Sequence, residues 1–343
     1  MNSVGIDISK GRSTIAVMRP FGEIVISPFE VRHTDSELSE LARRLKSLNG
    51  ETRVVMEATG NYHAPVAKLL HDAGLYVSVV NAKLVHGYGN NDLRRVKTDR
   101  KDAVKLANYG LDRWLTLPRY VPEENTRLLL KNCYRQYRQY SKVQTVLKNN
   151  LISLLDMTFP NANRLFVSPA RADGSEKWVD FVAEFWHCEC VSERSLKSFV
   201  NKYWRWCRKH GYNFSEEKAH AIYDEASGHI GVMPKSETTK LLVEQAVSQL
   251  SATSAALAAL KQEMQSLSSQ LPEYPVVMGM FGVGPILGPQ LIAEIGDVRR
   301  FYSKKALVAY AGIDAPPNDS GDVIGRHKSM SKVCLLYTSD AAD

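Results

Sequence analysis

Two carboxylates stand at the ends of apolar runs, where an ionised side chain is unusual. Asp7 lies in the sequence Gly-Ile-Asp-Ile, just before a turn-prone segment, and Glu57 ends the sequence Val-Val-Met-Glu. Short apolar runs of this kind are typical of buried strands. A carboxylate there is costly to bury unless it is paired with a cation or bound to a metal. Asp7 and Glu57 are therefore candidates for a metal site.

A second pair of carboxylates lies further along the chain. Asp99 and Asp102 are three residues apart behind Thr98, which favours a helix N-cap, so a helix would carry both acids on one face of its first turn. Four such acids could hold two divalent ions about 3.5–4 Å apart, the arrangement for in-line displacement at phosphorus. Oxygen ligands favour Mg²⁺ or Mn²⁺. Each acid alone is better explained as an ion-pair partner or a helix-start acid, but the four in this order favour metal binding.

The elements that must position these acids alternate strand and helix patterns over the first 110 residues. Strand patterns cover residues 4–8, 14–18, 23–28, 53–58 and 76–81, and helix patterns cover 36–48 and 62–73, with a further helix after residue 98. Three strands, then helix, strand, helix, strand and helix is the order of the RNase H-like fold. Order alone also fits other α/β folds, so the residues above decide in its favour.

The rest of the chain is mostly helical in pattern. Residues 122–157 read as one long helix, and residues 161–228 are mixed and rich in tryptophan. A second long helix, 237–271, carries apolar residues every seven positions in two seams, which predicts a coiled coil or helical hairpin. One seam is Val243, Leu250, Leu257, Met264 and Leu271, and the other is Ala246, Thr253, Leu260 and Leu267. We therefore predict an α/β domain followed by a mostly α C-terminal domain with a coiled-coil helix.

Length and composition limit the class of protein. The chain has 343 residues, 44% of them hydrophobic and 24% charged, which suits about two globular domains and excludes a disordered or wholly coiled-coil chain. No apolar run is long enough for a membrane span, and the N-terminus shows no signal peptide, so we expect a cytoplasmic protein without a membrane partner. Five cysteines are too few and too scattered for a disulfide framework.

Positive charge is concentrated in one segment. The net charge is +7, but residues 83–148 contain 15 Lys or Arg and 6 Asp or Glu, a balance of 15 − 6 = +9. On the helix predicted there, five cations follow one face at spacings of three and four residues, and Tyr137 and Tyr140 could stack on unpaired bases. The five are Arg127, Lys131, Arg135, Arg138 and Lys142. A charge run is often only a solvated face, but here no acid interrupts it, which favours nucleic-acid binding.

Three blocks around the acids resemble the motifs of a known enzyme family. The blocks are Gly5-Ile6-Asp7, Met56-Glu57-Ala58-Thr59-Gly60 followed by Tyr62, and Lys97-Thr98-Asp99-Arg100-Lys101-Asp102-Ala103. They resemble, in order and spacing, those of the DEDD-type insertion-sequence transposases, which are related to the Piv invertase and have an N-terminal domain similar to the RuvC Holliday-junction resolvase. The resemblance implies that Asp7, Glu57, Asp99 and Asp102 are the metal ligands.

The segment near the C-terminus resembles the second domain of the same family. Gly282 and Gly284 form a Gly-x-Gly loop that could meet a DNA phosphate as in a helix-hairpin-helix turn, although a tight interhelical turn is at least as plausible. The later Asn-Asp-Ser-Gly sequence contains Ser320, which the resemblance makes the nucleophile that attacks DNA. Without the family blocks, an ordinary turn would be the better interpretation. Because Ser320 is far from the acids in sequence, we expect the two domains to meet, within a chain or across subunits.

The resemblance implies the partners and the domain plan. The partners would be double-stranded donor and target DNA and a structured guide (bridge) RNA, with Mg²⁺ or Mn²⁺ as cofactor. We expect a homo-oligomer, a dimer or tetramer, with the heptad helix as a natural contact. The plan is a RuvC-like catalytic domain at 1–120, a basic helix at 121–160, a mixed insert at 161–236, a coiled-coil helix at 237–272, a partial serine transposase domain at 273–332 and an anomalous tail at 333–343.

The tail matches nothing expected of the family, which leads us to expect a truncated or foreign C-terminus. Two other functions stay open: a metal-dependent junction-resolving nuclease in which Ser320 is structural, and a non-catalytic nucleic-acid-binding remnant. A zinc site made of Cys188, Cys190, Cys207 and His210 is a weaker possibility, because nearby tryptophans suggest that these cysteines lie in a packed core.

Overall fold

The N-terminal part of the chain is built on a five-stranded mixed sheet in the order β3-β2-β1-β4-β5. Its strands are β1 (Asn2–Ser9), β2 (Arg12–Arg19), β3 (Glu23–Arg32), β4 (Thr52–Glu57) and β5 (Tyr76–Val80). The first three form an antiparallel meander, and β4 and β5 run parallel to β1. This computed structural model describes residues 1–88, 98–229, 231–312, 319–320 and 323–324. Internal contacts divide the chain into two units, 1–123 and 124–343.

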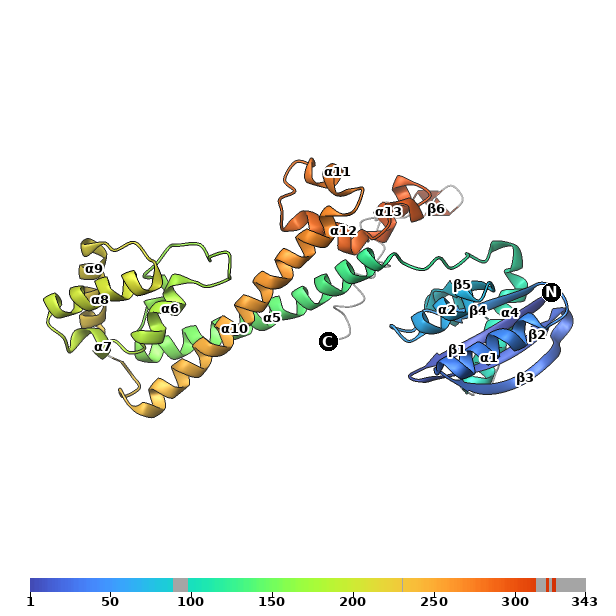
Figure 1. The fold of residues 1–343 in the computed structure, drawn as a ribbon, viewed down its shortest axis with the longest axis horizontal. Helices are drawn as coiled ribbons and strands as arrows, with labels where there is room; N and C mark the ends of the chain where they lie inside the picture. The colour runs from blue at the N-terminus through green and yellow to red at the C-terminus, as the bar shows by residue number, and fades with distance from the viewer. Residues whose placement is uncertain (89–97, 230, 313–318, 321–322, 325–343) are drawn as a thin grey trace. The chain divides into compact units, whose positions relative to one another are not determined.

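Helices cover both faces of this sheet (Figure 1). They are α1 (Asp35–Lys46), α2 (His63–Asp72), α3 (Ala82–His86) and α4 (Asp99–Asp112). The even-numbered residues of β1, such as Val4 and Ile6, pack with α1 and α2 in one core, because strand side chains alternate between faces. Val55 of β4 packs with Leu106 of α4 on the other face. The predicted RNase H-like α/β fold is confirmed by this order and by these strand directions.

The second unit is largely helical, which confirms the prediction of a mostly α C-terminal part. Its helices are α5 (Asn125–Thr158), α6 (Lys177–Glu184), α7 (Glu189–Ser192), α8 (Leu196–His210), α9 (Glu216–Gly228), α10 (Glu237–Ser269), α11 (Tyr274–Met278), α12 (Leu287–Ile295) and α13 (Lys304–Tyr310). The short strands β6 (Asp319–Ser320) and β7 (Val323–Ile324) form an antiparallel pair. Among the described residues, no helix is long and apolar enough to cross a membrane.

The two long helices α5 and α10 lie side by side as an antiparallel pair (Figure 1). Leu130, near the start of α5, packs in one cluster with Leu267 near the end of α10. Further along, Gln144 donates a hydrogen bond of 2.8 Å to Ser254. The heptad seam from Val243 to Leu271 is buried within the chain's own packing. This seam is therefore covered by the chain's own packing, and both an oligomer contact through the heptad helix and the coiled coil itself stay predictions.

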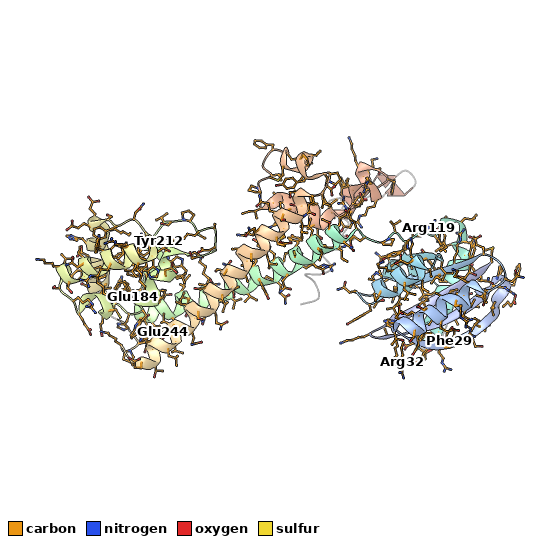
Figure 2. The ribbon with its side chains drawn as sticks, in the orientation of Figure 1. Phe29, Arg32, Arg119, Glu184, Tyr212 and Glu244 are labelled. Carbon is orange, nitrogen blue, oxygen red and sulfur yellow. The ribbon has the colours of Figure 1, made fainter. Side chains whose placement is uncertain are left out.

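The mixed insert, which lies between α5 and α10 in the sequence, forms a small helical body. We call residues 159–236 the distal subdomain; it contains α6 to α9, and Figure 2 labels Glu184 and Tyr212 within it. Helix α8 buries Phe199, Tyr203 and Trp206, which are four and three residues apart and so lie on one helical face. Aromatic burial of this kind gives the subdomain a core of its own, shared with the adjoining ends of α5 and α10. The sequence pattern did not reveal these helices.

Candidate active site

Asp7 is the seventh residue of the chain and the sixth of strand β1. It lies opposite Thr14 in the antiparallel register with β2, and its side chain is partly exposed. Since Val4, Ile6 and Ile8 point into the core beneath α1 and α2, the intervening residues Gly5 and Asp7 face the other side of the sheet. The sheet therefore presents this carboxylate on the face that α4 covers.

Glu57 comes next to Asp7 on the neighbouring strand. Strands β1 and β4 are parallel, with Gly5 opposite Val55 and Ile6 opposite Met56. Continuing that register by one residue places Glu57, the last residue of β4, beside Asp7, and adjacent strands lie about 4.8 Å apart. The alternation of side chains puts both carboxylates on the same face. The register thus pairs the two acids that the apolar runs singled out.

Helix α4 brings the other two acids to this face. Thr98 caps the helix by accepting a hydrogen bond from the backbone N–H of Lys101 at 3.3 Å, which confirms the predicted N-cap. The first turn contains Asp99, which is exposed, and Asp102, which is partly buried. A carboxylate in a first turn also interacts favourably with the helix dipole.

Two glycines let α4 lie directly against the sheet. A Cβ atom at Gly5 would come within 2.0 Å of the Ala103 carbonyl oxygen and 2.4 Å of the Ala107 backbone nitrogen. At the other end of the helix, a Cβ at Gly110 would lie 2.3 Å from the Ser3 hydroxyl. Helix α4 therefore runs in the opposite direction to β1. Its first turn lies at the end of β1 that carries Asp7. From the sequence we treated Gly5 only as part of a motif. Its position two residues before Asp7 was a signal, which we missed, that a helix contacts the strand closely there.

The backbone thus directs all four acids to one end of the sheet, but their side chains are not gathered into a finished ligand set. Within the described ranges, no three His, Cys, Asp or Glu side chains form a group that could hold a metal ion. The donor set itself, four carboxylates and no nitrogen or sulfur ligand, fits Mg²⁺ or Mn²⁺ rather than zinc.

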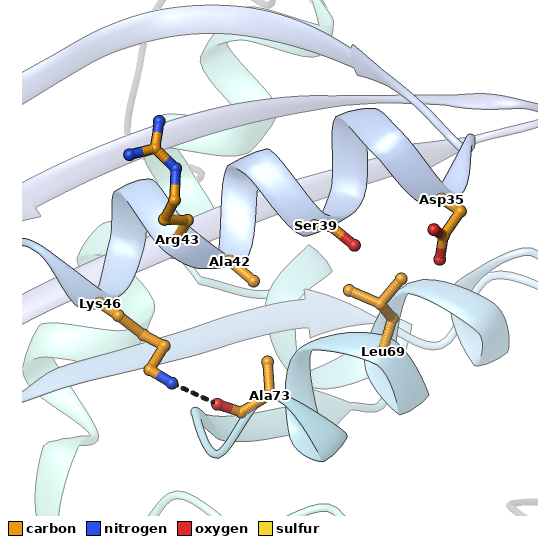
Figure 3. Close-up of a pocket in the computed structure, with 7 residues that line it drawn as sticks. All are labelled: Asp35, Ser39, Ala42, Arg43, Lys46, Leu69 and Ala73. Atoms are coloured by element: carbon orange, nitrogen blue, oxygen red, sulfur yellow. Dashed lines mark hydrogen bonds between the residues drawn. The ribbon is translucent and has the colours of Figure 1, made fainter.

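A hollow in this unit lies away from these acids. It has a volume of about 420 Å³ and lies between α1 and α2, on the sheet face opposite Asp7 (Figure 3). Its lining includes Asp35, Arg43 and Leu69, and Lys46 bridges the two helices by donating to the Ala73 carbonyl at 3.0 Å. Because it is a groove between packed helices and lies away from the acids, we do not assign it to the site.

Ser320 lies in the second unit at the end of the two-residue strand β6. Its backbone pairs with Val323 of β7 in an antiparallel ladder. The neighbouring residues 313–318, 321–322 and 325–343, including the tail that we expected to be anomalous, lie outside the described residues. Ser320 thus belongs to the second unit, whereas the four acids belong to the first.

Two family models match the chain over the segments that carry these residues. The first, described as "Transposase" and named for DEDD transposases of the IS110 group, matches residues 4–160, and the second, "Transposase IS116/IS110/IS902 family", matches residues 274–334. Together they cover well over half of the chain and all five predicted catalytic positions. This chain belongs to the IS110 family of transposases. It is thus a DNA transposase, a class of enzyme that recombines DNA.

Two curated proteins and one solved structure are among those to which this transposase is similar. The chain is 24% identical over 326 residues to the "insertion element IS116 uncharacterized 44.8 kDa protein" of Streptomyces clavuligerus, covering 94% of this chain and 78% of that protein. It is 27% identical over 134 residues to the pilin gene-inverting protein of Moraxella bovis, covering 39% of this chain and 38% of that protein. A solved structure of RuvC from T. thermophilus with a Holliday junction substrate is 13% identical, with a TM-score of 0.27 over 35% of this chain and 99% of that one.

One residue of the transposase's predicted nucleic-acid-binding stripe is not available for binding. Arg127 is only 5% exposed; it forms an ion pair with Glu273 and donates to the Gly296 carbonyl at 3.3 Å. Helical spacing put Arg127 in line with the other cations, but tertiary packing turned its end of α5 into the core formed with α10 and α12. Arg127 is therefore a structural residue, and its assignment to a nucleic-acid contact is corrected.

The buried pair of Arg127 and Glu273 should contribute strongly to stability. The hydrogen bond from Arg127 lowers the pKa of Glu273. We expect Glu273→Gln to lower the free energy of unfolding of the second unit by up to about 3 kcal/mol, since it removes the buried carboxylate partner of Arg127 and leaves only the exposed Glu124, at 3.4 Å. Denaturant unfolding at pH 7 measures this, and Glu244→Gln, which removes an exposed partner of Lys240, is the matched control.

The same pair predicts an acid dependence of stability. A glutamate whose pKa is lowered by folding stabilises the protein above its unfolded pKa of about 4.3, and that stability disappears as the pH falls through the folded pKa. The difference between the wild type and Glu273→Gln should therefore shrink as the pH is lowered from 6 towards about 3. A difference that stays constant over this range would contradict the assignment.

Two of the remaining stripe cations, Arg138 and Lys142, line a groove of about 250 Å³. The groove is also lined by Tyr134 and Tyr137 of α5 and by Gln290 of α12. Arg135 is exposed, whereas Lys131, Arg138 and Lys142 are each engaged in further interactions within the chain. The aromatic and cationic lining is compatible with nucleic-acid binding, which for these residues stays a prediction.

The predicted Gly-x-Gly loop joins α11 to α12. Gly282 has a left-handed backbone (φ 80°), which a residue with a side chain rarely adopts, and neither Gly282 nor Gly284 has another group within 4 Å of a Cβ position. The side chain of the adjacent Phe281 is fully exposed. The turn therefore presents an open backbone between two helices, the geometry that a phosphate contact requires.

The cysteines considered as zinc ligands lie in or beside the distal subdomain's core. Cys188 and Cys207 are buried among its aromatic side chains, and Cys190 packs against that core. The neighbouring His187 is engaged through both ring nitrogens; its Nε2 contacts the Met233 carbonyl at 3.0 Å, and its Nδ1 contacts the Cys188 thiol at 3.8 Å. Burial raises the pKa values of Cys190 and Cys207, which favours neutral thiols.

Proposed function

We propose that this transposase cuts and rejoins the DNA of an insertion sequence with two sets of residues, the acids Asp7, Glu57, Asp99 and Asp102 and the hydroxyl of Ser320. The observation that carries the proposal is the seating of α4 on β1 through Gly5, together with the parallel register of β1 and β4. These two features direct four carboxylates to one sheet end. The pilin gene-inverting relatives and the IS116 protein support DNA as the substrate.

The four acids would hold Mg²⁺ or Mn²⁺, which when bound would stabilise negative charge at the scissile phosphate. Asp7 and Glu57 are fixed by the sheet, so their separation is set by strand pairing, and Asp99 and Asp102 follow the position of α4. Rigid elements of this kind hold ligands more precisely than loops do. Glu57, at the very end of β4, has the greater freedom to adjust.

Ser320 would attack the phosphorus of the scissile phosphodiester. Its Oγ forms the new bond to phosphorus while the bond to the 3′ oxygen breaks, and the 3′ oxygen leaves as a hydroxyl after taking a proton. The product is a 5′-phosphoserine adduct that a 3′ hydroxyl of the exchanged strand can resolve by the reverse reaction. Activation of the hydroxyl by a base or metal is required, and the proposal needs the acids and Ser320 to act on the same phosphodiester.

We further propose that the enzyme is guided by a structured RNA and works as a homo-oligomer on donor and target DNA. The family resemblance in the sequence supports the guide, and the groove beside Arg138 and Lys142 offers cations and aromatic rings of the kind that RNA recognition uses. Binding of RNA and DNA should be strongly salt-dependent, because phosphate contacts release counterions.

The nucleophile can be tested by trapping DNA on the protein. We expect wild-type protein, incubated with Mg²⁺ and DNA spanning an insertion-sequence end, to form a covalent adduct that survives denaturation, and Ser320→Ala to form none. Ser329→Ala, another serine of the same segment, is the matched control and should form the adduct normally. If Ser320→Ala still forms the adduct, the assignment is wrong; cleavage by the wild type without any adduct would instead favour the junction-resolving nuclease.

A further inference from the structure

Three cations of the distal subdomain gather around two aromatic rings. The guanidinium of Arg171 lies 3.9 Å from the ring centre of Tyr212, and the amine of Lys177 lies 5.0 Å from the same ring and 4.9 Å from the ring of Phe166. The amine of Lys218 lies 5.6 Å from the Phe166 ring. The three residues come from a loop, from α6 and from α9, so only the tertiary structure brings them together.

None of these three cations forms an ion pair with a carboxylate of the described residues. Asp173, the acid nearest to Arg171 in sequence, accepts hydrogen bonds from the backbone and hydroxyl of Ser175, and Asp180 accepts one from the Tyr212 hydroxyl. Burial lowers the pKa of Lys177, and the charges of Lys218 and Arg171 lower it further. Contacts with the aromatic rings explain the position of each cation. The electrostatic repulsion among the three positive charges remains unfavourable, and a bound anion would reduce it.

Two of these cations and one of the rings line a pocket. It has a volume of about 250 Å³ and is lined by Arg171, Lys177 and Tyr212, the backbone at Gly211, and the neutral polar residues Ser168 and Asn213. The lining contains no carboxylate. Hydroxyl, amide, backbone and cationic groups are the ones that contact nucleic-acid phosphates. Arg171 is held in place because it donates to the carbonyls of His210 and Gly211, at 2.8 and 3.2 Å.

Helix α8 leads directly into this pocket and adds an exposed stacking surface. It contains five Lys or Arg residues and no Asp or Glu. Trp204 is 43% exposed, and the guanidinium of Arg208, one turn further on, lies 5.4 Å from its ring. From Trp204 to Gly211 the helix rises about 10 Å, a span of one or two nucleotides. An exposed indole flanked by cations suits an unpaired base, whereas duplex DNA keeps its bases stacked.

We propose that the distal subdomain binds an unpaired nucleic-acid strand, with a backbone phosphate in the pocket lined by Arg171 and Lys177, further attracted by the nearby charge of Lys218, and a base stacked on Trp204. The site lies outside the four acids, Ser320 and the groove beside α5, and it does not depend on the proposed chemistry. The shared ligand chemistry is a phosphate next to an unpaired base, which either RNA or single-stranded DNA provides.

The pocket is tested in the full chain by removing the charge of Lys177, which lines it, together with that of Lys218, which shares the Phe166 ring with Lys177. The double variant Lys177→Gln, Lys218→Gln should bind single-stranded RNA or DNA of one sequence about tenfold more weakly than the wild type. It should also reduce the slope of log affinity against log salt concentration by about 0.7 for each phosphate that is no longer neutralised. Lys235→Gln with Lys240→Gln removes the same charge from lysines already paired with Glu193 and Glu244 and is the control. The pair Lys177→Arg and Lys218→Arg keeps the charges and should bind like the wild type.

The stacking surface gives an independent readout. Trp204→Ala should weaken binding of the single strands about tenfold, consistent with the loss of one stacked base, and should leave duplex DNA binding unchanged. Ultraviolet crosslinking of 4-thiouridine RNA and of the matching thiothymidine DNA should label peptides that contain Trp204 or Tyr212, and the better-labelled strand identifies the sugar. The proposal is overturned if the Lys177 and Lys218 variant matches its control in affinity and salt slope, or if crosslinks avoid these peptides. Adduct formation by Ser320 is assayed separately, so failure here is distinct from failure of the proposed function.

Discussion

An Asp7→Asn variant is expected to cleave DNA about 100- to 1000-fold more slowly than the wild type while binding DNA with the same affinity. Asp7 is held by strand β1 beside Glu57, at the end of the sheet reached by the first turn of α4. The substitution keeps the shape of the side chain and removes the charge that a divalent cation needs. Charge stabilisation by a metal is worth several kcal/mol, and each 1.4 kcal/mol corresponds to a factor of ten in rate.

The measurement is a time course of strand cleavage with Mg²⁺, alongside binding to the same DNA in Ca²⁺ or chelator. Asp35→Asn is the matched control, because Asp35 also lies in a helix first turn but faces the hollow between α1 and α2 (Figure 3). The control should retain full activity. Removing divalent ions should stop cleavage by the wild type, and either Mg²⁺ or Mn²⁺ should restore it.

Each other result would point to a different function. Cleavage by Asp7→Asn within a few-fold of the wild type would refute the metal site. A wild type that never cleaves DNA, but binds it in a salt-sensitive way, would identify a nucleic-acid-binding remnant if Asp7→Asn binds equally well. Metal-dependent cleavage without a Ser320 adduct would leave the four acids in place and remove the serine from the mechanism.

Substitution of Gly5 by alanine should have the second large effect, although its side chain carries no chemistry. The new Cβ would lie 2.0 Å from the Ala103 carbonyl oxygen and 2.4 Å from the Ala107 nitrogen, and both are backbone atoms that cannot rotate away. Helix α4 must therefore move off the sheet. Overpacking of this kind costs about 1–3 kcal/mol and sometimes more, and the displacement would carry Asp99 and Asp102 away from Asp7.

We expect Gly5→Ala to lower the thermal midpoint of the first unit by several degrees and to reduce cleavage by at least about tenfold, consistent with the sensitivity of catalysis to small displacements. Added Mg²⁺ should not restore the rate. Gly228→Ala in α9 is the control, because nothing lies within 4 Å of its Cβ position and its backbone is not left-handed. A Gly5→Ala protein with wild-type stability and activity would show that α4 is not seated in this way.

Much of the N-terminal fold followed from local pattern. The apolar runs predicted all five strands of the sheet, and the Thr98 cap and the leucine spacing predicted the helices to within a few residues. Periodicity and capping are local properties, so a single sequence is enough to read them. The distal subdomain was harder, because its helices are short and its aromatic residues pack across several elements rather than along one.

Other features depended on contacts between distant residues. The spacing of cations on α5 placed Arg127 on a nucleic-acid-binding face, but Glu273, far away in sequence, pairs with it in the core. The heptad seam of α10 was correct as a buried stripe, and α5 of the same chain covers it. The cations Arg171, Lys177 and Lys218 come from three separate segments and meet around two aromatic rings, which no sequence motif could have indicated.

The sequence by itself therefore determined which residues have the chemistry: four acids in an order that resembles the DEDD transposases, a serine in a Ser-Gly turn, and a basic helix. Tertiary structure alone decided where these residues lie relative to their neighbours in each unit. Strand register puts Asp7 beside Glu57, and two glycines let α4 approach closely enough to add Asp99 and Asp102. The physical reason is that identity and spacing are encoded along the chain, whereas register, helix seating and ion pairing are settled by packing between segments far apart in sequence.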